Sequence, residues 1–187
     1  MIDEYLFLGI GLNLQRIIAV KDFAHIKEGQ KGGYIQSEKN LDQEGNAWIA
    51  GTAGAYDHSW LTDNCRVCGN ARVSDHAVIR DTSRVSGGAK ISGRSIIGGS
   101  AWVVGDACIT NAEWDISPLQ IQGTRHYFTV SAPGYISLAG FVYPIEFWIN
   151  NYVDLLKTKG YNDSEMDEYA TYIQTAVAWS ENIKGRV

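Results

Sequence analysis

One six-residue pattern of small, aliphatic and turn-forming positions repeats along the middle of the chain without an insertion. Between Gly45 and Thr110 it occurs eleven times, with Gly or Asp at position one and a small residue at position three. Position five is aliphatic, and larger than Ala in ten of the eleven repeats. Side chains two residues apart on an extended strand share a face, so positions three and five point inward and positions four and six outward. Self-similarity at a fixed short period is typical of a solenoid.

The spacing also predicts how the strands assemble. Three six-residue sides close a triangular coil of 18 residues, with Gly or Asp at each tight corner. Successive coils then stack as parallel strands about 4.8 Å apart. Residues 45–110 hold nearly four such coils. The expected fold class is therefore mainly β, a parallel β-helix built as a triangular solenoid.

Residues 1–44 are expected to form an N-terminal cap with lead-in strands. An apolar stretch runs from Met1 to Val20, but Asp3 and Glu4 stand where a signal peptide carries basic residues, and no clear cleavage site follows. We interpret this stretch as a packed strand or helix. No run in the chain is long enough to span a membrane, and we expect cytoplasmic residence.

Residues 111–187 predict a β-hairpin followed by two helices. Two runs rich in β-forming residues, 127–130 and 135–138, flank a Ser-Ala-Pro-Gly turn. Pro144 is suited to open a helix that ends at Gly160. An Asn-Asp-Ser run shortly after it offers caps for a second helix with apolar residues at helical spacing.

The repeat resembles that of the left-handed β-helix proteins of the hexapeptide-repeat superfamily, over residues 45–110. The stretch KGGYIQSEKNLDQEG, residues 31–45, is similar to the leading segment of phage and prophage hexapeptide proteins. The resemblance implies left-handed coils, a homotrimer of parallel prisms and a phage or prophage origin. It also raises acyl transfer as an activity, because hexapeptide acyltransferases use a histidine near a subunit interface as a general base.

Charge is distributed unevenly along the chain. The net charge of −5 divides into +1 for the repeat, with six Lys/Arg against five Asp, −2 for residues 1–44 and −4 for residues 111–187. A broad nucleic-acid surface requires clustered positive charge, and an acidic mimic of DNA requires the opposite. The repeat fits neither class, so a nucleic-acid partner is not expected.

The cysteines and glycines do not form a chemical motif. Cys65 and Cys68 spell C-x-x-C, but the repeat places Cys65 inside and Cys68 outside, and Cys108 lies on another side of the prism. Thiols on opposite faces neither pair nor hold one metal ion. The glycines recur at corners, outside any phosphate-binding motif. We expect no metal ion and no cofactor.

Outward side chains at position four stack in three columns, because residues eighteen apart lie one above another. The columns are Trp48, Arg66, Arg84 and Trp102; then Gly54, Arg72, Lys90 and Cys108; then Trp60, Val78 and Ile96, with Trp114 next if the frame continues. The third column is apolar, and such a stripe on a surface indicates an interface. We predict that Trp60, Val78 and Ile96 lie at a homotrimer contact; the alternative is coverage by the C-terminal hairpin and helices.

The first two columns place basic side chains on neighbouring coils. Like charges on adjacent strands are unfavourable unless an anion or carboxylate lies between them, and guanidinium groups bind phosphate while aromatic rings stack on bases. We therefore predict a small anionic, nucleotide-like ligand in a cleft between prisms. Its predicted contacts are either Arg66 and Arg84 or Arg72 and Lys90. Trp48 and Trp102 are the candidate stacking surfaces, and His58 and His76 are the candidate donors at the adjoining corner. The alternative is that each Arg lies over a neighbouring Trp, with its charge in water.

His58 and His76 occupy the same corner one coil apart and are the residues on which an acyltransferase would depend. The same corner position favours Asn, Asp or His for backbone reasons alone, and the repeats lack the protruding loop common in those enzymes. The function expected is a non-catalytic, oligomeric binding protein that sequesters a small anionic ligand, in a role that counters host defence. The alternatives are a protein-binding scaffold or inhibitor that acts on a host protein through the C-terminal unit, and a hexapeptide-type acyltransferase using His76 and His58.

Overall fold

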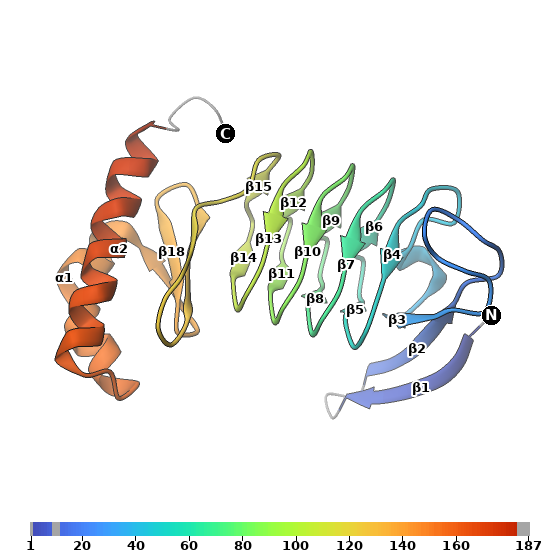
Figure 1. The fold of residues 1–187 in the computed structure, drawn as a ribbon, viewed down its shortest axis with the longest axis horizontal. Coiled ribbons are helices and arrows are strands. Elements are labelled where there is room, and N and C mark those ends of the chain that lie inside the picture. The colour runs from blue at the N-terminus through green and yellow to red at the C-terminus, as the bar shows by residue number, and fades with distance from the viewer. Residues whose placement is uncertain (1, 9–11, 183–187) are drawn as a thin grey trace.

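A computed structural model, which describes residues 2–8 and 12–182, shows a parallel β-solenoid of about four turns with an appendage at each end (Figure 1). Figure 1 shows the N-terminal strands beside the first coil and the two helices beyond the last one. The predicted fold class is confirmed, including the C-terminal strands and helices.

Each coil contributes one short strand to each of three parallel sheets, as the hexapeptide spacing predicts. The first sheet contains β4 (Trp48–Ile49), β7 (Arg66–Val67), β10 (Arg84–Val85) and β13 (Trp102–Val103). The second contains β6 (Trp60–Leu61), β9 (Val78–Ile79), β12 (Ile96–Ile97) and β15 (Glu113–Trp114). The third contains β5 (Gly54–Ala55), β8 (Arg72–Val73), β11 (Lys90–Ser92) and β14 (Cys108–Thr110).

Small and branched side chains fill the interior of the solenoid. Ala71 and Val73, at positions three and five of one side, have no solvent exposure, and the same holds for Ala89 and Ile91 one coil further on. Strand pairs such as Arg84 with Arg66 and Val85 with Val67 confirm the register of eighteen residues. The alternation of inner and outer positions along each strand is therefore the one predicted.

Aspartates at the corners join each coil to the next. Asp57, Asp75 and Asp81 have positive φ angles, between 56° and 59°, a conformation that Asp adopts more readily than most residues. The carboxylate of Asp57 accepts a hydrogen bond from the Asp75 amide (3.3 Å), and that of Asp75 accepts one from the Gly93 amide (2.8 Å). Each corner side chain thus binds a backbone donor that strand pairing leaves free.

The frame shifts by one residue in the last coil, which corrects one prediction. Ile96 pairs with Glu113, and Ile97 pairs with Trp114, seventeen residues further on. Because a shift of one residue exchanges the two faces of a strand, Trp114 lies inside, fully buried, and does not continue the outward column. Its large ring fits there because the interior ends at this coil.

The N-terminal segment forms strands rather than a helix. The strands β1 (Ile2–Leu8), β2 (Leu12–Ile18) and β3 (Lys31–Ile35) extend the third sheet, with β3 parallel to β5. Met1 and residues 9–11 of the predicted apolar stretch lie outside the described residues. A 3-10 turn, η1 (Glu38–Asn40), follows. There the buried Asn40 side chain donates to the Ser59 carbonyl oxygen (2.9 Å), which fixes the turn on the first coil.

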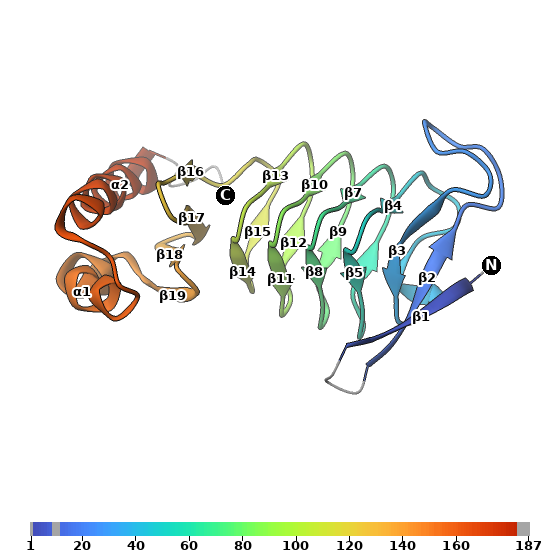
Figure 2. The ribbon, with the colours of Figure 1, turned by 60° about the horizontal axis from the view of Figure 1, so that its bottom comes forward.

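The C-terminal unit is an antiparallel sheet covered by two helices. The strands are β16 (Gln120–Gln122), β17 (Tyr127–Ala132), β18 (Tyr135–Leu138) and β19 (Phe141–Pro144), and the helices are α1 (Ile145–Thr158) and α2 (Asp163–Asn182). The predicted hairpin and helices are confirmed, and the flanking strands β16 and β19 were not predicted. Figure 2 shows the sheet between the last coil and the helices. The Cys108 amide donates to the Ser137 hydroxyl (3.2 Å) across this junction.

We predict that the corner aspartates contribute to stability through their acceptor oxygens. Asp75→Ala removes the acceptor for the Gly93 amide and should lower the free energy of unfolding by about 1–2 kcal/mol at this exposed site. Asp75→Asn keeps an acceptor oxygen and tolerates the positive φ angle, so it should cost less than about 1 kcal/mol. Urea denaturation of the three proteins measures the difference. Equal losses for Ala and Asn would show that the side-chain acceptor contributes nothing.

Candidate functional site

The three outward columns lie on three different faces of the solenoid. We call the outer surface of β4, β7, β10 and β13 the arginine–tryptophan face, that of β5, β8, β11 and β14 the basic face, and that of β6, β9, β12 and β15 the apolar face. Strand pairing confirms that residues eighteen apart stack vertically on each face. The predicted ligand contacts must therefore be judged face by face.

On the arginine–tryptophan face, the two tryptophans have opposite environments. Trp102 is 51% exposed, whereas Trp48 is only 4% exposed. Phe23, in the loop after β2, packs edge-on against the Trp48 ring with centroids 5.6 Å apart. Trp48 is therefore not a free stacking surface, which corrects the prediction for this residue. The physical reason is that the N-terminal segment folds over the first coil, a contact that the repeat itself does not encode.

The two arginines between these tryptophans are also held differently. Arg66 is half-buried, and its Nη1 donates to the carbonyl oxygens of Asn46 and Cys65. Burial and the neighbouring Arg84 lower the pKa of the Arg66 guanidinium. Arg84 is exposed, with its Cζ 4.9 Å from the centroid of the Trp102 ring. The predicted cation–π alternative thus holds for Arg84, while Arg66 binds backbone carbonyl groups.

The basic face offers one exposed cation. Arg72 Nη1 donates to the carbonyl oxygens of Thr52 (2.7 Å), Asn70 and Ala71 (both 3.1 Å). Lys90 pairs in register with Arg72 and is exposed. An ammonium and a guanidinium therefore lie on neighbouring strands, but the guanidinium already binds three carbonyl groups.

His58 and His76 form an exposed pair of stacked rings. Their centroids are 4.9 Å apart and their planes differ by 4°. Neither imidazole makes a hydrogen bond to another described residue, so nothing in this part of the chain orients a ring nitrogen towards a substrate, as a general base requires. The pair lies at the corner between the basic and apolar faces, because it falls between β5 and β6 and between β8 and β9.

The two alternative pairs of basic contacts, Arg66 with Arg84 and Arg72 with Lys90, lie on separate faces, as the repeat frame places them. Arg66, Arg84 and Trp102 share the arginine–tryptophan face, while Arg72 and Lys90 lie on the basic face. The histidine corner borders the basic face and not the arginine–tryptophan face. Of the predicted set, an exposed cation and an exposed aromatic ring come together at one place, at Arg84 and Trp102.

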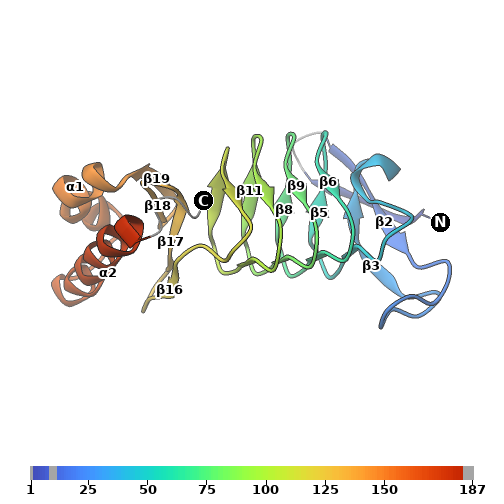
Figure 3. The ribbon, with the colours of Figure 1, turned by 90° about the horizontal axis from the view of Figure 1, so that it is seen from above.

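The apolar face remains open along the solenoid. Trp60 is 47% exposed, and Val78 and Ile96 above it are partly exposed. The described part of the C-terminal unit, residues 120–182, lies beyond the last coil (Figure 3), and Trp60 stays exposed, so the alternative of coverage by the hairpin and helices is wrong for the described residues. The C-terminal sheet attaches instead to the end of the solenoid, where the Cys108 amide donates to the Ser137 hydroxyl and Trp114 Nε1 donates to the Ser131 carbonyl oxygen.

A polar cluster in the C-terminal unit was not predicted. His126 Nδ1 lies 2.5 Å from the Tyr161 hydroxyl, and the Tyr169 hydroxyl donates to the His126 carbonyl oxygen (2.8 Å). Burial, with the neighbouring Tyr169, raises the pKa of Tyr161 well above its usual value. The Arg125 guanidinium lies 4.7 Å from the Tyr161 ring centroid. Arg125 and His126 lie 35 to 44 positions before Tyr161 and Tyr169 in the chain, so no local pattern signals their contact.

Three further properties of the described residues concern metal binding, thiol reactivity and the length of the helices. Within residues 2–8 and 12–182, no group of three His, Cys, Asp or Glu side chains is arranged to hold a metal ion. Burial raises the pKa of the Cys65 thiol to about 12, which leaves it protonated and unreactive. Neither described helix is long and apolar enough to cross a membrane.

Comparison with known proteins adds no assignment. No protein-family model matches the chain, and no curated protein matches it at a significant level.

We predict that the bonds between α2 and the β16–β17 turn weaken at acid pH. Glu168 accepts hydrogen bonds from the Thr124 hydroxyl (2.6 Å) and amide (2.9 Å) and from the Tyr172 hydroxyl (2.7 Å). The Thr124 hydroxyl, with the Tyr172 hydroxyl, lowers the pKa of Glu168 from 4.5. A lowered folded-state pKa gives stability that is complete above pH 4.5 and is lost as pH falls through the folded-state value.

Glu168→Gln should therefore lose less stability than the wild type between pH 7 and pH 3, as measured by urea denaturation at both pH values. Asp167→Asn is the matched control, since it neutralises the neighbouring exposed carboxylate without touching these bonds. An unchanged pH dependence in Glu168→Gln would contradict the assignment.

Proposed function

We propose that this protein is a non-catalytic, oligomeric binding protein that sequesters a small anionic, nucleotide-like ligand on its arginine–tryptophan face. The observation that carries the proposal is the exposed Trp102 ring with the exposed Arg84 guanidinium over it, at 4.9 Å. A guanidinium binds a phosphate group with paired, charge-assisted hydrogen bonds, and an indole ring stacks on a base. The base would stack on the face of the Trp102 ring that Arg84 leaves open, and the phosphate would bind the solvent-facing donors of the guanidinium.

The half-buried Arg66, on the strand that pairs with that of Arg84, adds positive charge to the same face. Its guanidinium binds backbone carbonyl groups, so it contributes fixed positive charge next to Arg84. A phosphate placed against Arg84 would offset the repulsion between the two stacked cations. The single flat face encloses little of a ligand, which favours a cleft between two solenoids.

Self-association on the apolar face would supply that cleft. The open stripe of Trp60, Val78 and Ile96 is costly to leave in water, and a flat, regular solenoid face is well suited to pack against a copy of itself. We propose a homotrimer with this stripe at the contact. The likeness to hexapeptide-repeat proteins supports the same assembly, and the likeness of residues 31–45 to phage proteins supports a phage origin and a role in countering host defence.

A second candidate function is protein binding through the C-terminal unit. Large apolar side chains of β18, β19 and α1 are exposed there: Tyr135, Val142, Phe147 and Ile149. The Tyr143 and Phe147 rings lie 4.5 Å apart in the same region. A group of exposed aromatic residues of this kind is typical of protein contacts, and a host protein is the partner that this alternative proposes.

We predict that the pure protein is a trimer in solution. Light scattering should return three times the chain mass of 20.6 kDa, and Trp60→Asp should shift the mass to that of a monomer, because a carboxylate in the contact would lose its hydration. Trp102→Asp, a matched change on the arginine–tryptophan face, should leave the mass of the trimer unchanged. A monomer mass for the wild type would refute the assembly.

We predict that a nucleotide stabilises the protein through Arg84. Among a panel of nucleotides and acyl-CoA, a bound nucleotide should raise the melting temperature, and Arg84→Ala should weaken its binding about tenfold or more in calorimetry, as expected for loss of a charge-assisted contact. Trp102→Ala should weaken it as well, whereas Trp60→Ala should not if the trimer is retained.

Arg72→Ala tests the basic face with the same ligand. Binding that depends on Arg72 but not on Arg84 would move the site to that face. Stabilisation by acyl-CoA, with turnover lost in His76→Ala, would instead favour an acyltransferase. If no small ligand of the panel binds and an interaction with a host protein is measured, the second candidate function is favoured.

A further inference from the structure

The arginine–tryptophan face ends at β13, which is the last strand of its sheet. One coil earlier, the equivalent edge is bonded by the last coil itself. The Arg84 amide donates to the Ala101 carbonyl oxygen (2.9 Å). The Ser86 amide donates to that of Val103 (2.9 Å). Because backbone groups on an edge strand need other partners or water, the edge that carries Trp102 has to be bonded by groups from outside the repeat.

Two side chains supply the bonds that a further coil would make. The Trp102 amide donates to the Ser117 hydroxyl (2.9 Å). The Gln120 side chain acts as a peptide group: its Nε2 donates to the Trp102 carbonyl oxygen (2.7 Å), and its Oε1 accepts from the Val104 amide (2.8 Å). Gln120 lies eighteen residues after Trp102, where the next rung of the column would begin. One carboxamide thus satisfies a donor and an acceptor of the same edge.

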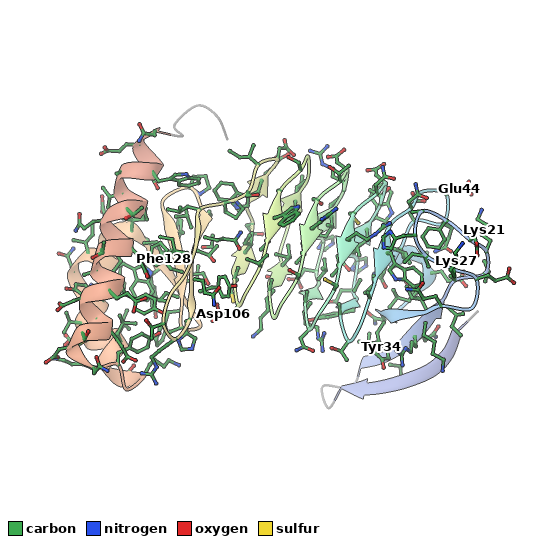
Figure 4. All side chains as sticks on the ribbon, in the orientation of Figure 1. Lys21, Lys27, Tyr34, Glu44, Asp106 and Phe128 are labelled. Carbon is green, nitrogen blue, oxygen red and sulfur yellow. The ribbon has the colours of Figure 1, made fainter. Side chains whose placement is uncertain are left out.

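The segment that carries Gln120 is itself fixed in the C-terminal sheet. The Gln120 backbone pairs with Thr129 of β17. Asp106, in the last coil, accepts a hydrogen bond from the Tyr127 amide (3.1 Å). Figure 4 shows Asp106 at this junction, between the last coil and the sheet that contains Phe128. Gln120 therefore joins the two sheets, the C-terminal one through its backbone and the arginine–tryptophan one through its side chain.

The place of the Trp102 ring depends on this edge. The ring is 51% exposed, with the Arg84 guanidinium 4.9 Å from its centroid. A half-exposed side chain on an edge strand follows the backbone beneath it, so unbonded backbone groups at this edge would let the ring move. A mobile ring loses more entropy when it stacks on a base, and this loss weakens binding. The bonds that fix the Trp102 backbone therefore affect the affinity of the face for a ligand.

We propose that Gln120 is a positioning residue of the ligand site at Arg84 and Trp102, and that it holds the Trp102 ring where a base stacks. This role rests on the proposed function, because Trp102 is one of the two groups that would bind the nucleotide. It makes the C-terminal sheet part of the site, since the side chain that fixes Trp102 comes from β16. Gln120 acts through the Trp102 backbone and does not contact the ligand.

Gln120→Met tests this role, because it keeps the length of the side chain and removes both of its bonds. In calorimetry on the full-length protein, AMP should bind this variant about threefold or more weakly than the wild type, since part of the stacking on the base is lost. In a Trp102→Ala background the same change should have no further effect. Gln122→Met is the matched control: Gln122 is an exposed residue of the same strand that accepts only from the Tyr127 hydroxyl (3.3 Å) among the described residues, and its loss should leave AMP binding unchanged.

Two NMR measurements test the positioning without a ligand. In Gln120→Met the Val104 amide should exchange with solvent about tenfold faster, as expected for loss of one hydrogen bond. The order parameter of the Trp102 indole N–H, assigned with Trp102→Phe, should fall. Gln122→Met should change neither quantity.

Unchanged exchange of Val104 with an unchanged order parameter of Trp102 would overturn the role of Gln120. So would an equal loss of AMP affinity in the Trp102→Ala background, or a loss as large in Gln122→Met, because either result would show a general effect on the fold. If the wild type binds no nucleotide, the proposed function fails, and the two NMR measurements alone decide whether Gln120 holds Trp102.

Discussion

The stacking of each coil on the next at a spacing of eighteen residues is the constraint on which the structure depends. Backbone amides on all three sides donate to the coil above or below, as from Trp48 to Cys65 (3.1 Å), Gly54 to Ala71 (3.0 Å) and Trp60 to Ala77 (2.9 Å). Three sheets that close on each other leave a narrow interior, which only small residues at position three and branched ones at position five fill without voids. The corner aspartates then add side-chain acceptors to the same stack.

The same stacking determines the chemistry of the outer faces. A position that is basic in two successive coils places like charges on adjacent strands, and the protein offsets their repulsion in two ways. Arg66 and Arg72 donate to backbone carbonyl groups, whereas Arg84 lies over the Trp102 ring. As a result, the arginines differ in availability despite equivalent places in the repeat. Of these three, Arg84 is the arginine whose guanidinium makes no hydrogen bond to the described residues.

The two ends of the solenoid are closed differently. At the C-terminal end, the one-residue frame shift turns Trp114 inward, and its indole N–H binds the C-terminal sheet through Ser131. At the N-terminal end, a loop that carries Phe23 covers Trp48 and leaves a cavity beside it. One buried tryptophan is therefore fully satisfied by the chain, and the other has a donor with no partner among the described residues.

The sequence by itself determined the solenoid, its register and the composition of the three outer columns, because each depends on contacts between residues at a fixed spacing. It also predicted the hairpin of β17 and β18 and both helices, whose turn and cap signals are local. Only the tertiary structure decided that Trp48 is covered, that Trp114 points inward and that His126 meets Tyr161. These outcomes depend on how irregular segments dock onto the ends of the regular solenoid, and no repeat within the chain encodes that docking.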